Sequence, residues 1–447
     1  MIAPARRAAF DALLEVGTER ADLPHALARV RLRLPDERDR ALAGEIAAGT
    51  LRWQGAFDHV IEQFARRPLA RLDPEIVVIL RLAMFQLLHL DRVPASAAVN
   101  DAVSLARAAG KRSAAPLVNA VLRRVSRERG RLPLPPRPPP DGSRTAVLDY
   151  LSITLSHPRW LAARWLDRYG FEAVEAWARF NNTPAALTLR ANRLRIGAPD
   201  LAERLAGHGV RTRPGRFAPD ALVIEAGNPL LTPLAGQGLF TVQDEASQLV
   251  TLVTAVQPGE RVLDACVSPG GKALAMAAAM GDRGLIVATD LRGRRVELLA
   301  RMIREAGASS VRVVRADASG PLPFATAFDC VLLDAPCSGL GTIRRDPEIR
   351  WRRREADLAV LAAAQLRMLR QVAQVVGPGG RMTYATCSSE TEENEEVVDA
   401  FVADGGFEPL GPPGAVPPSL LDEQGRLKTL PFRDGLEAFF AAPLVRR

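Results

Sequence analysis

The second half of the chain alternates short apolar runs with stretches of helical spacing, and this pattern constrains the fold more than any other feature. The apolar runs cover 261–265, 285–289, 311–315, 328–334 and 381–386. Strands that alternate with helices are joined by crossover connections, which leave the strands parallel within one sheet. The pattern therefore predicts a doubly wound parallel α/β sheet, in a domain that spans residues 241–447.

Two of the apolar runs end in a loop that carries a cysteine. The run VLLD ends at Asp334 and leads into Cys337, and the run that ends in YAT leads into Cys387. The carboxyl ends of parallel strands lie along one edge of a sheet, so both thiols and the Asp334 carboxylate could face one pocket. A structural role as a small buried side chain is the alternative for a strand-end cysteine, and it is our interpretation of Cys266 and Cys330.

A glycine loop follows the first of these strands. The segment VLDACVSPGGKA places Gly270 and Gly271 between a strand and a helix, where backbone N–H groups can approach a ligand closely. It matches neither GxGxxG nor GxxxxGK[ST], so dinucleotide and P-loop interpretations have no direct support. Asp290 ends the next strand and could accept hydrogen bonds from a ribose, and Asp317 could accept one from an adenine amino group. These residues predict a nucleoside-bearing cofactor, with helix caps or turns as the alternative for each aspartate.

A thiol beside such a cofactor indicates covalent catalysis on a base. A thiolate that adds to C6 of a pyrimidine makes C5 nucleophilic toward an electrophilic methyl group. The carboxyl of Asp334 could stabilise the charge that develops on the ring, and a second thiol could help to remove the C5 proton. The residues alone do not rank Cys337 and Cys387 as the nucleophile.

Residues 1–130 have helical spacing throughout and contain more arginine than acidic residues. Near their end, Leu117, Val121 and Val125 form an apolar stripe, and the arginines between 123 and 129 are left for another face. We interpret this region as a bundle around a central helix at 76–90. Its basic face indicates either an RNA-docking surface or an ordinary solvated surface.

A proline-rich segment, 131–143, predicts a semi-rigid linker. The region 144–240 begins with helical spacing and continues from 184 as a small α/β module. Arg190, Arg193 and Arg195 cluster on or beside the first strand of that module. They could form an RNA-facing sheet or a solvated edge, and the sequence does not separate the two.

The net charge of +8 and the pI near 10.0 favour a polyanionic partner. No run of about 20 apolar residues lacks charges, and the N-terminus lacks the apolar core of a signal peptide, so we expect a cytoplasmic protein without membrane association. None of the four cysteines forms a CxxC pair and the five histidines are scattered. We therefore expect reduced thiols and no metal.

The motifs LDACVSPGGK, LLDAPCSGLGTIRRDPEIRW and YATCS together resemble the RNA cytosine-5 methyltransferases, which use S-adenosylmethionine on a Rossmann-like domain. GTLRW, AAVN and LVNAVLRR resemble the NusB-type RNA-binding domain. SHPRWL, LTLRANRL and QDEASQL carry the resemblance through the middle of the chain, where it implies a small RRM-like module. This is the arrangement of the bacterial Sun/Fmu (RsmB) type of 16S ribosomal RNA methyltransferases.

The resemblance implies that Cys387 is the nucleophile, that Cys337 assists release of the methylated RNA, and that Asp334 reaches both cofactor and target base. The residues that it implies for the S-adenosylmethionine pocket are Cys266, Val267, Ser268, Pro269, Gly270, Gly271, Lys272, Asp290, Asp317 and Asp334. It also implies 16S ribosomal RNA as the substrate, and we expect a monomer.

The chain departs from the family pattern at Val267 and Ser268, where two alanines are usual, at Ala273, where threonine is usual, and at Asp346, where histidine is frequent. Another RNA, such as tRNA, is the alternative substrate. Two other functions are a nicotinamide-dependent oxidoreductase, disfavoured by the missing GxGxxG, and a non-catalytic RNA-binding protein. The intact aspartate and two cysteines argue against the latter.

Overall fold

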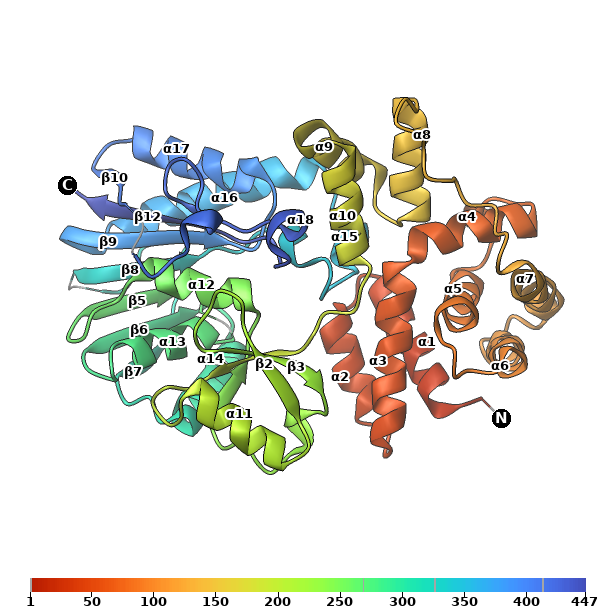
Figure 1. The fold of residues 1–447 in the computed structure, drawn as a ribbon, viewed down its shortest axis with the longest axis horizontal. Coiled ribbons are helices and arrows are strands. Elements are labelled where there is room, and N and C mark those ends of the chain that lie inside the picture. Colours follow the sequence, from red (N-terminus) through yellow and green to blue (C-terminus); the bar gives the residue numbers. More distant parts are fainter. Residues whose placement is uncertain (1, 268, 325–326, 412–413) are drawn as a thin grey trace. The chain divides into compact units, whose positions relative to one another are not determined.

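The computed structural model describes residues 2–267, 269–324, 327–411 and 414–447, and the chain forms two compact units (Figure 1). The first, here called the helical unit, contains the chain up to Pro184 and also Ile343–Glu355. The second, here called the sheet unit, contains Ala185–Thr342 and Ala356–Arg447. The segment Ile343–Glu355, which follows the loop that carries Cys337, therefore belongs to the helical unit.

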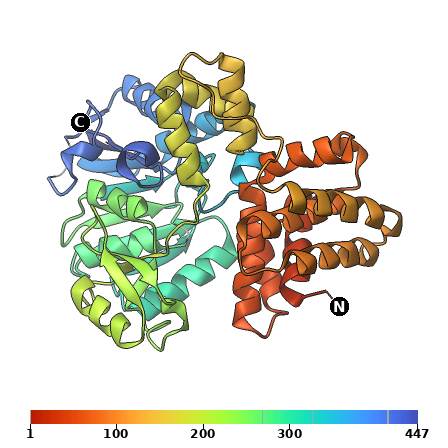
Figure 2. The same cartoon turned by 45° about the vertical axis from the view of Figure 1, so that its right-hand side comes forward.

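The first 130 residues are helical, as predicted, and Figure 2 shows their helices packed against one another. The helices of this unit are α1 (Pro4–Gly17), α2 (Leu23–Arg31), α3 (Glu37–Arg52), α4 (Gln54–Ala65), α5 (Pro74–His89), α6 (Ala95–Ala108), α7 (Ala115–Glu128), α8 (Arg144–Asp149), α9 (Arg159–Tyr169), α10 (Phe171–Asn181) and α15 (Ile349–Arg352).

Helix α5 is the centre of the helical core, which confirms the predicted central helix. Pro74 occupies its first turn, where proline costs no hydrogen bond, and Ile79 and Leu80 are fully buried. Buried polar side chains between these helices are paired with one another. Arg6 of α1 donates to Asp101 of α6 at 2.5 Å and to Gln86 of α5 at 2.6 Å. Burial on nearly all sides of α5 explains why its sequence shows no polar face.

The segment Ile343–Glu355 is anchored in the helical unit by Arg350, which has no exposed surface. Its guanidinium donates to the carbonyl oxygen of Ser156 at 2.9 Å and to Oδ1 of Asn182 at 3.0 Å. The neighbouring Glu348 is also buried, and its Oε1 accepts the Leu23 N–H at 3.0 Å. Its Oε2 finds no hydrogen-bond partner among the described residues.

Burial, reinforced by the charge of Asp346, raises the pKa of Glu348 from 4.5 to about 7. Between these values the folded protein holds a proton that the unfolded chain releases, so the free energy of unfolding falls as pH rises through this window. Glu348→Gln keeps the acceptor for Leu23 and removes the charge. We expect urea denaturation to show a gain of about 1–3 kcal/mol at pH 8 and less than about 1 kcal/mol at pH 5.

The exposed Glu45 on α3 is the control for this experiment, because Glu45→Gln should change the unfolding free energy little at either pH. An equal gain for Glu348→Gln at pH 5 and pH 8 would contradict a raised pKa at this carboxyl.

The sheet unit begins with the predicted small α/β module. Its strands are all antiparallel, in the order β2-β3-β1-β4, and α11 (Ala198–Gly207) packs on them through Leu201 and Leu205. The sequence analysis missed the second and fourth strands. The four strands are β1 (Thr188–Ala191), β2 (Arg211–Pro214), β3 (Ala221–Ala226) and β4 (Phe240–Val242).

Both interpretations of the arginine cluster on this module are wrong for one of its members. Arg190 is buried and donates to the carbonyl oxygen of Gly271 and to the side chain of Gln243, because burial leaves its guanidinium no water to donate to. Arg195 is exposed and donates to the carbonyl oxygen of Ala306 at 3.0 Å.

The larger sheet has eight strands, in the order β10-β12-β9-β8-β5-β6-β7 with β11 paired to β12. The five predicted strands exist and pair in parallel. The predicted parallel sheet is extended by three further strands, because β12 pairs with β9 in antiparallel fashion and β10 and β11 pair with β12 in the same way. The strands are β5 (Arg261–Ala265), β6 (Leu285–Asp290), β7 (Val311–Arg315), β8 (Phe328–Asp334), β9 (Val376–Thr386), β10 (Phe407–Pro409), β11 (Leu427–Lys428) and β12 (Phe440–Arg446).

Helices cover both faces of this sheet. One core joins Val262 and Leu332 of the strands to α12 (Glu245–Thr254), α13 (Gly271–Ala279) and α14 (Gly293–Ala306), and a second joins Leu263 and Val331 to α16 (Ala356–Ala373) and α17 (Glu395–Ala403). A last short helix is α18 (Pro431–Asp434). Because β6 and β7 lie on one side of β5 and β8 and β9 on the other, the strand order reverses between β5 and β8. Ligands bind at the carboxyl ends of the strands at such a reversal.

Within the described ranges, no helix is long and apolar enough to cross a membrane. In the same ranges, no group of three or more histidine, cysteine, aspartate or glutamate side chains is placed to hold a metal ion.

Candidate active site

The two cysteine loops lie next to each other at the carboxyl ends of β8 and β9. These strands pair in parallel, with Asp334 opposite Ala385, and the loops that follow bring Sγ of Cys337 to 3.4 Å from Sγ of Cys387. The Gly341 N–H donates to the Cys387 carbonyl oxygen at 2.9 Å, and a Cβ added at Gly341 would lie 2.7 Å from that oxygen. The structure thus brings the two predicted thiols into contact and leaves no room for a side chain at Gly341.

The Cys337 thiol has a raised pKa. The hydrogen bond with Cys387, together with burial, raises it well above its usual value. Cys337 therefore favours its protonated form, and in that form it can donate to the sulfur of Cys387.

Asp334 is half of an ion pair beside the thiols. Nζ of Lys272, on α13, lies 2.6 Å from Oδ2 of Asp334. Burial opposes the charged form of Lys272, but the charge and hydrogen bond of Asp334 outweigh it, so the pKa of Lys272 is raised. The pair fixes the Asp334 carboxylate at the strand end and leaves its second oxygen free of this lysine.

Asp264 of β5 lies beneath this pair and was not singled out from the sequence. It has no exposed surface, and neither of its carboxyl oxygens finds a hydrogen-bond partner among the described residues. Burial, followed by the nearby charge of Asp334, raises its pKa well above the usual range. A neutral carboxylic acid at this position adds no second negative charge beside Asp334.

The glycine loop joins β5 to α13 through two residues with left-handed backbone. Cys266 has φ of 62° and Gly270 has φ of 109°, and a Cβ added at Gly270 would meet Leu299 at 2.4 Å. Val267 N–H donates to the Thr289 carbonyl oxygen at 2.9 Å, which ties the loop to β6. Ser268 lies outside the described residues.

Pro269 is exposed and Gly271 begins α13, with its carbonyl held by Arg190. Burial lowers the pKa of Arg190 to about 10. The loop is thus supported from the small module as well as from the large sheet, a contribution that the sequence did not indicate.

The two other predicted aspartates lie at the expected strand ends. Asp290 is the last residue of β6, and its Oδ1 accepts the Arg292 N–H at 2.8 Å. Asp317 follows β7, is exposed, and its Oδ1 accepts from the N–H and hydroxyl of Ser319, which lower its pKa. In both cases one oxygen completes a turn, as the alternative interpretation held. Oδ2 of Asp290 also lies 3.8 Å from a guanidinium nitrogen of Arg295.

These residues fit a nucleoside-bearing cofactor. A glycine loop at the strand reversal leads into the start of α13, and carboxylates lie at or just after the ends of β6, β7 and β8. Sequence reasoning missed the buried Glu393, which accepts hydrogen bonds from both cysteine loops. It lies in the run TEENEE, a composition typical of the exposed first turn of a helix. No signal in the sequence distinguishes Glu393 from the neighbouring glutamates.

The sheet order, the glycine loop and the strand-end carboxylates together define a methyltransferase domain. A family model described as 16S rRNA methyltransferase RsmB/F matches residues 251–445, and a NusB family model matches 3–127. A third, for the ferredoxin-like domain of RsmF/B-like methyltransferases, matches 157–230. The chain belongs to the RsmB/F family of 16S rRNA methyltransferases, which confirms the predicted family and its three kinds of domain.

Similar proteins match over nearly the whole chain. A probable ribosomal RNA small subunit methyltransferase B of Bacillus subtilis is 34% identical, over 92% of this chain and 91% of its own length. The ribosomal RNA small subunit methyltransferase B of Pseudomonas putida is 34% identical, over 89% and 88%. Among solved structures, PH0851 covers 99% of both chains with a TM-score of 0.82 at 26% identity. A methyltransferase homolog from Pyrococcus horikoshii covers 68% of this chain and all of its own, with a TM-score of 0.60 at 27% identity.

Proposed function

We propose that this rRNA methyltransferase transfers a methyl group from S-adenosylmethionine to C5 of a cytosine in 16S rRNA, through a covalent bond between Cys387 and C6. The observation that carries the proposal is the 3.4 Å contact between two thiols beside the Asp334–Lys272 pair. A nucleophile and a proton carrier need this proximity.

Cys387 supplies the nucleophile in this mechanism. Its sulfur bonds to C6 of the cytosine, which raises the electron density at C5. Cys337 is the neutral thiol beside it, so Cys337 can stabilise a Cys387 thiolate by donating a hydrogen bond before the attack.

Asp334 holds the ring during this addition. Its free carboxylate oxygen can accept a hydrogen bond from the exocyclic amine, and a proton held between Asp334 and N3 would offset the charge that develops there. Lys272 orients Asp334 by its 2.6 Å contact. We propose this role for Lys272 alongside the cofactor contact that the family resemblance implies.

Cys337 acts after the methyl group has been added to C5. A base must take the C5 proton so that the Cys387–C6 bond can break and the RNA can leave. Cys337, in contact with the sulfur of Cys387, is the group we propose for this step. Once Cys387 is bonded to C6, the Cys337 thiol gives up its own proton to solvent, and the thiolate that results takes the C5 proton while the C5–C6 double bond forms and Cys387 leaves as a thiolate.

S-adenosylmethionine supplies an electrophilic methyl group when it is bound. We propose that the backbone from Cys266 to Gly271 faces its amino acid portion and that Asp290 and Asp317 accept hydrogen bonds from its ribose and adenine. The names of the relatives, ribosomal RNA small subunit methyltransferases, support 16S rRNA as the substrate. A cytoplasmic monomer is consistent with that substrate and stays a prediction.

The test is to incubate the purified chain with radiolabelled S-adenosylmethionine and either 16S rRNA or bulk tRNA, then digest the RNA and separate its nucleosides. Label in 5-methylcytidine from 16S rRNA supports the proposal. Label in another nucleoside contradicts cytosine-C5 chemistry, and label in tRNA alone contradicts the substrate.

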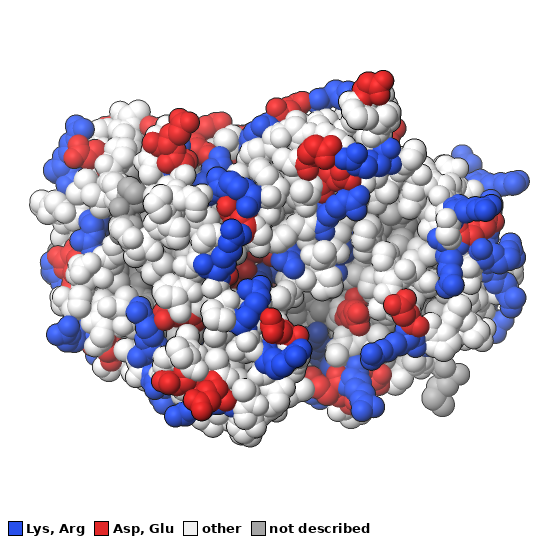
Figure 3. Space-filling model, in the orientation of Figure 1, with Lys and Arg blue, Asp and Glu red and all other residues white. Residues whose placement is uncertain are grey.

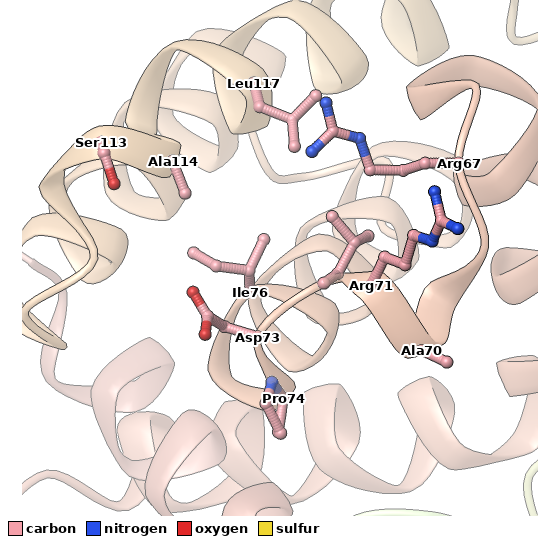
Figure 4. Close-up of a pocket in the computed structure, with 10 residues that line it drawn as sticks. Arg67, Ala70, Arg71, Asp73, Pro74, Ile76, Ser113, Ala114 and Leu117 are labelled. Atoms are coloured by element: carbon pink, nitrogen blue, oxygen red, sulfur yellow. The ribbon is translucent and has the colours of Figure 1, made fainter.

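We further propose that the helical unit contacts RNA phosphates at a pocket of about 480 Å³ between the start of α5 and the start of α7 (Figure 4). Arg67 and Arg71 line it, and no ion pair is found for either guanidinium in the described part of the chain. The one lining carboxylate, Asp73, is paired with Lys111 at 3.0 Å. Figure 3 shows further lysine and arginine side chains along the same edge of this unit, over α7.

Replacing both Arg67 and Arg71 with glutamine should weaken RNA binding by about 3- to 10-fold at physiological salt and lower the slope of log Kd against log salt by about 1–2, because two phosphate contacts are lost. Filter binding across a salt series measures both quantities. The control is Arg144→Gln with Arg370→Gln, two exposed arginines already paired with Asp167 and Asp404. Equal losses in the two double variants would show that only net charge matters.

A further inference from the structure

Glu393 is a buried carboxylate that connects the two cysteine loops. It has no exposed surface and ends the short 3₁₀ turn Thr391–Glu393, between the second cysteine and α17. No lysine or arginine forms an ion pair with it in the described part of the chain. A buried carboxylate without a cation is costly, so the hydrogen bonds it accepts must stabilise it.

Two of these hydrogen bonds come from Ser338, the residue that follows Cys337. Its N–H donates to Oε1 of Glu393 at 2.7 Å, and its hydroxyl donates to Oε2 at 2.5 Å. Nε2 of Gln365 donates to Oε1 at 2.9 Å and also to the carbonyl oxygen of Pro336 at 3.0 Å. The residues on both sides of Cys337 are thus tied to Glu393.

A fourth hydrogen bond to Glu393 comes from Ser388, the residue that follows Cys387. Its hydroxyl donates to the same Oε2 atom at 2.5 Å, and the two serine hydroxyl oxygens lie 3.2 Å apart. The neighbouring Asn394 donates to the Ser388 carbonyl oxygen at 3.0 Å and accepts from Thr386 at 2.5 Å. The residues on both sides of Cys387 are therefore tied to the same short turn.

The Glu393 carboxylate differs from a neutral amide at this position because both of its oxygens accept hydrogen bonds and neither donates. It only accepts hydrogen bonds, so both serine hydroxyls must point their hydrogens at it, and one oxygen atom fixes the positions of the two residues that follow the cysteines. Hydrogen bonds to a carboxylate are stronger than those between neutral groups, so they hold the two serines firmly. Simple loop packing would need no buried charge.

We propose that Glu393 is a positioning residue that sets the distance between Cys337 and Cys387, and so the efficiency with which Cys337 releases the RNA from Cys387. The inference rests on the proposed function. Attack by Cys387 needs one thiol, whereas release needs both thiols at contact distance. Loosening the Glu393 contacts should therefore slow release more than attack.

The test is Glu393→Gln, which keeps the shape of the side chain and replaces one acceptor oxygen by an NH₂ donor. We expect kcat for methyl transfer to fall about 10-fold or more, with KM for RNA and for S-adenosylmethionine within about 3-fold. The fraction of protein in a denaturant-resistant RNA adduct at steady state should rise. A role confined to folding would lower adduct and turnover together, in proportion to the fraction of folded protein.

A second measurement does not depend on activity. Diamide oxidises two neighbouring thiols to a disulfide and is itself reduced to the hydrazine, so the rate of Cys337–Cys387 linkage, followed by mass spectrometry of peptides, reports their distance. We expect linkage to be several-fold slower in Glu393→Gln, and slower to a lesser degree in Ser388→Ala, which removes one donor. Glu396→Gln, an exposed neighbour on α17, is the control for all of these measurements.

The outcomes separate the two proposals. If the wild type methylates no cytosine and forms no adduct, the proposed function fails, and the linkage rates still test the spacing. If the wild type is active and Glu393→Gln matches it in turnover, adduct and linkage rate, the positioning role is overturned. A loss of thermal stability with unchanged linkage rate would also overturn it.

Discussion

Cys387→Ala is expected to abolish methyl transfer, with a loss of about 10³-fold or more in kcat, while the affinity for RNA stays within about 3-fold of the wild type. The reason is that no other group on this strand end can replace the C6-bonded sulfur. Cys337 keeps its proton because the hydrogen bond to Cys387 and burial raise its pKa. RNA affinity depends mainly on phosphate contacts, to which one small side chain contributes little.

The measurements are single-turnover methyl transfer and filter binding with the same RNA. Cys330→Ala is the matched control, since Cys330 is a fully buried thiol within β8 and should leave chemistry unchanged at some cost in stability. Turnover at the wild-type rate in Cys387→Ala would exclude it as the nucleophile. Activity lost in Cys337→Ala alone, with no adduct, would exchange the roles of the two thiols.

Cys337→Ala is expected to trap the RNA. Attack by Cys387 and the first methyl transfer should proceed, but the C5 proton then lacks its acceptor and the Cys387–C6 bond persists. We expect steady-state turnover to fall by about 10²- to 10⁴-fold, the usual contribution of a positioned acid or base. A protein–RNA adduct that survives denaturant and depends on S-adenosylmethionine should accumulate on a gel.

The double variant Cys337→Ala with Cys387→Ala should show no adduct, which identifies Cys387 as the linked residue. Full activity of the single variant without any adduct would remove Cys337 from the release step. A trapped complex that forms without S-adenosylmethionine would instead mean that Cys337 opposes the attack itself.

The sequence predicted the fold well wherever local patterns carry the information. The five parallel strands have strong apolar runs with clear ends, and each is present at its predicted place. The antiparallel strands β10 to β12 were missed because they depend on pairing in three dimensions: β12 pairs with β9, more than 50 residues earlier in the sequence, and the short β10 and β11 pair with β12. Glycines and a proline hid the start of β9 at Val376, so only its second half was predicted.

The candidate site shows the same division. The two cysteines, Asp334 and the glycine loop could be predicted because each lies at the end of a strand that is recognisable in the sequence. Partners chosen in three dimensions could not be predicted, such as Glu393 with the two serines or Arg190 with Gly271. The raised pKa of Cys337 also depends on one sulfur–sulfur contact and on burial, neither of which leaves a sequence pattern.

The path of the chain through Ile343–Glu355 limits how the protein can be divided. A fragment that ends at Pro184 contains every helix of the first region but lacks Arg350, which donates to Ser156 and Asn182. Buried acceptors in that fragment would lose their donor, at a cost of about 1–3 kcal/mol for each group. The helical unit is therefore not a detachable module, because its last piece is encoded more than 150 residues after the rest. An insertion or deletion just after Cys337 would alter both units at once.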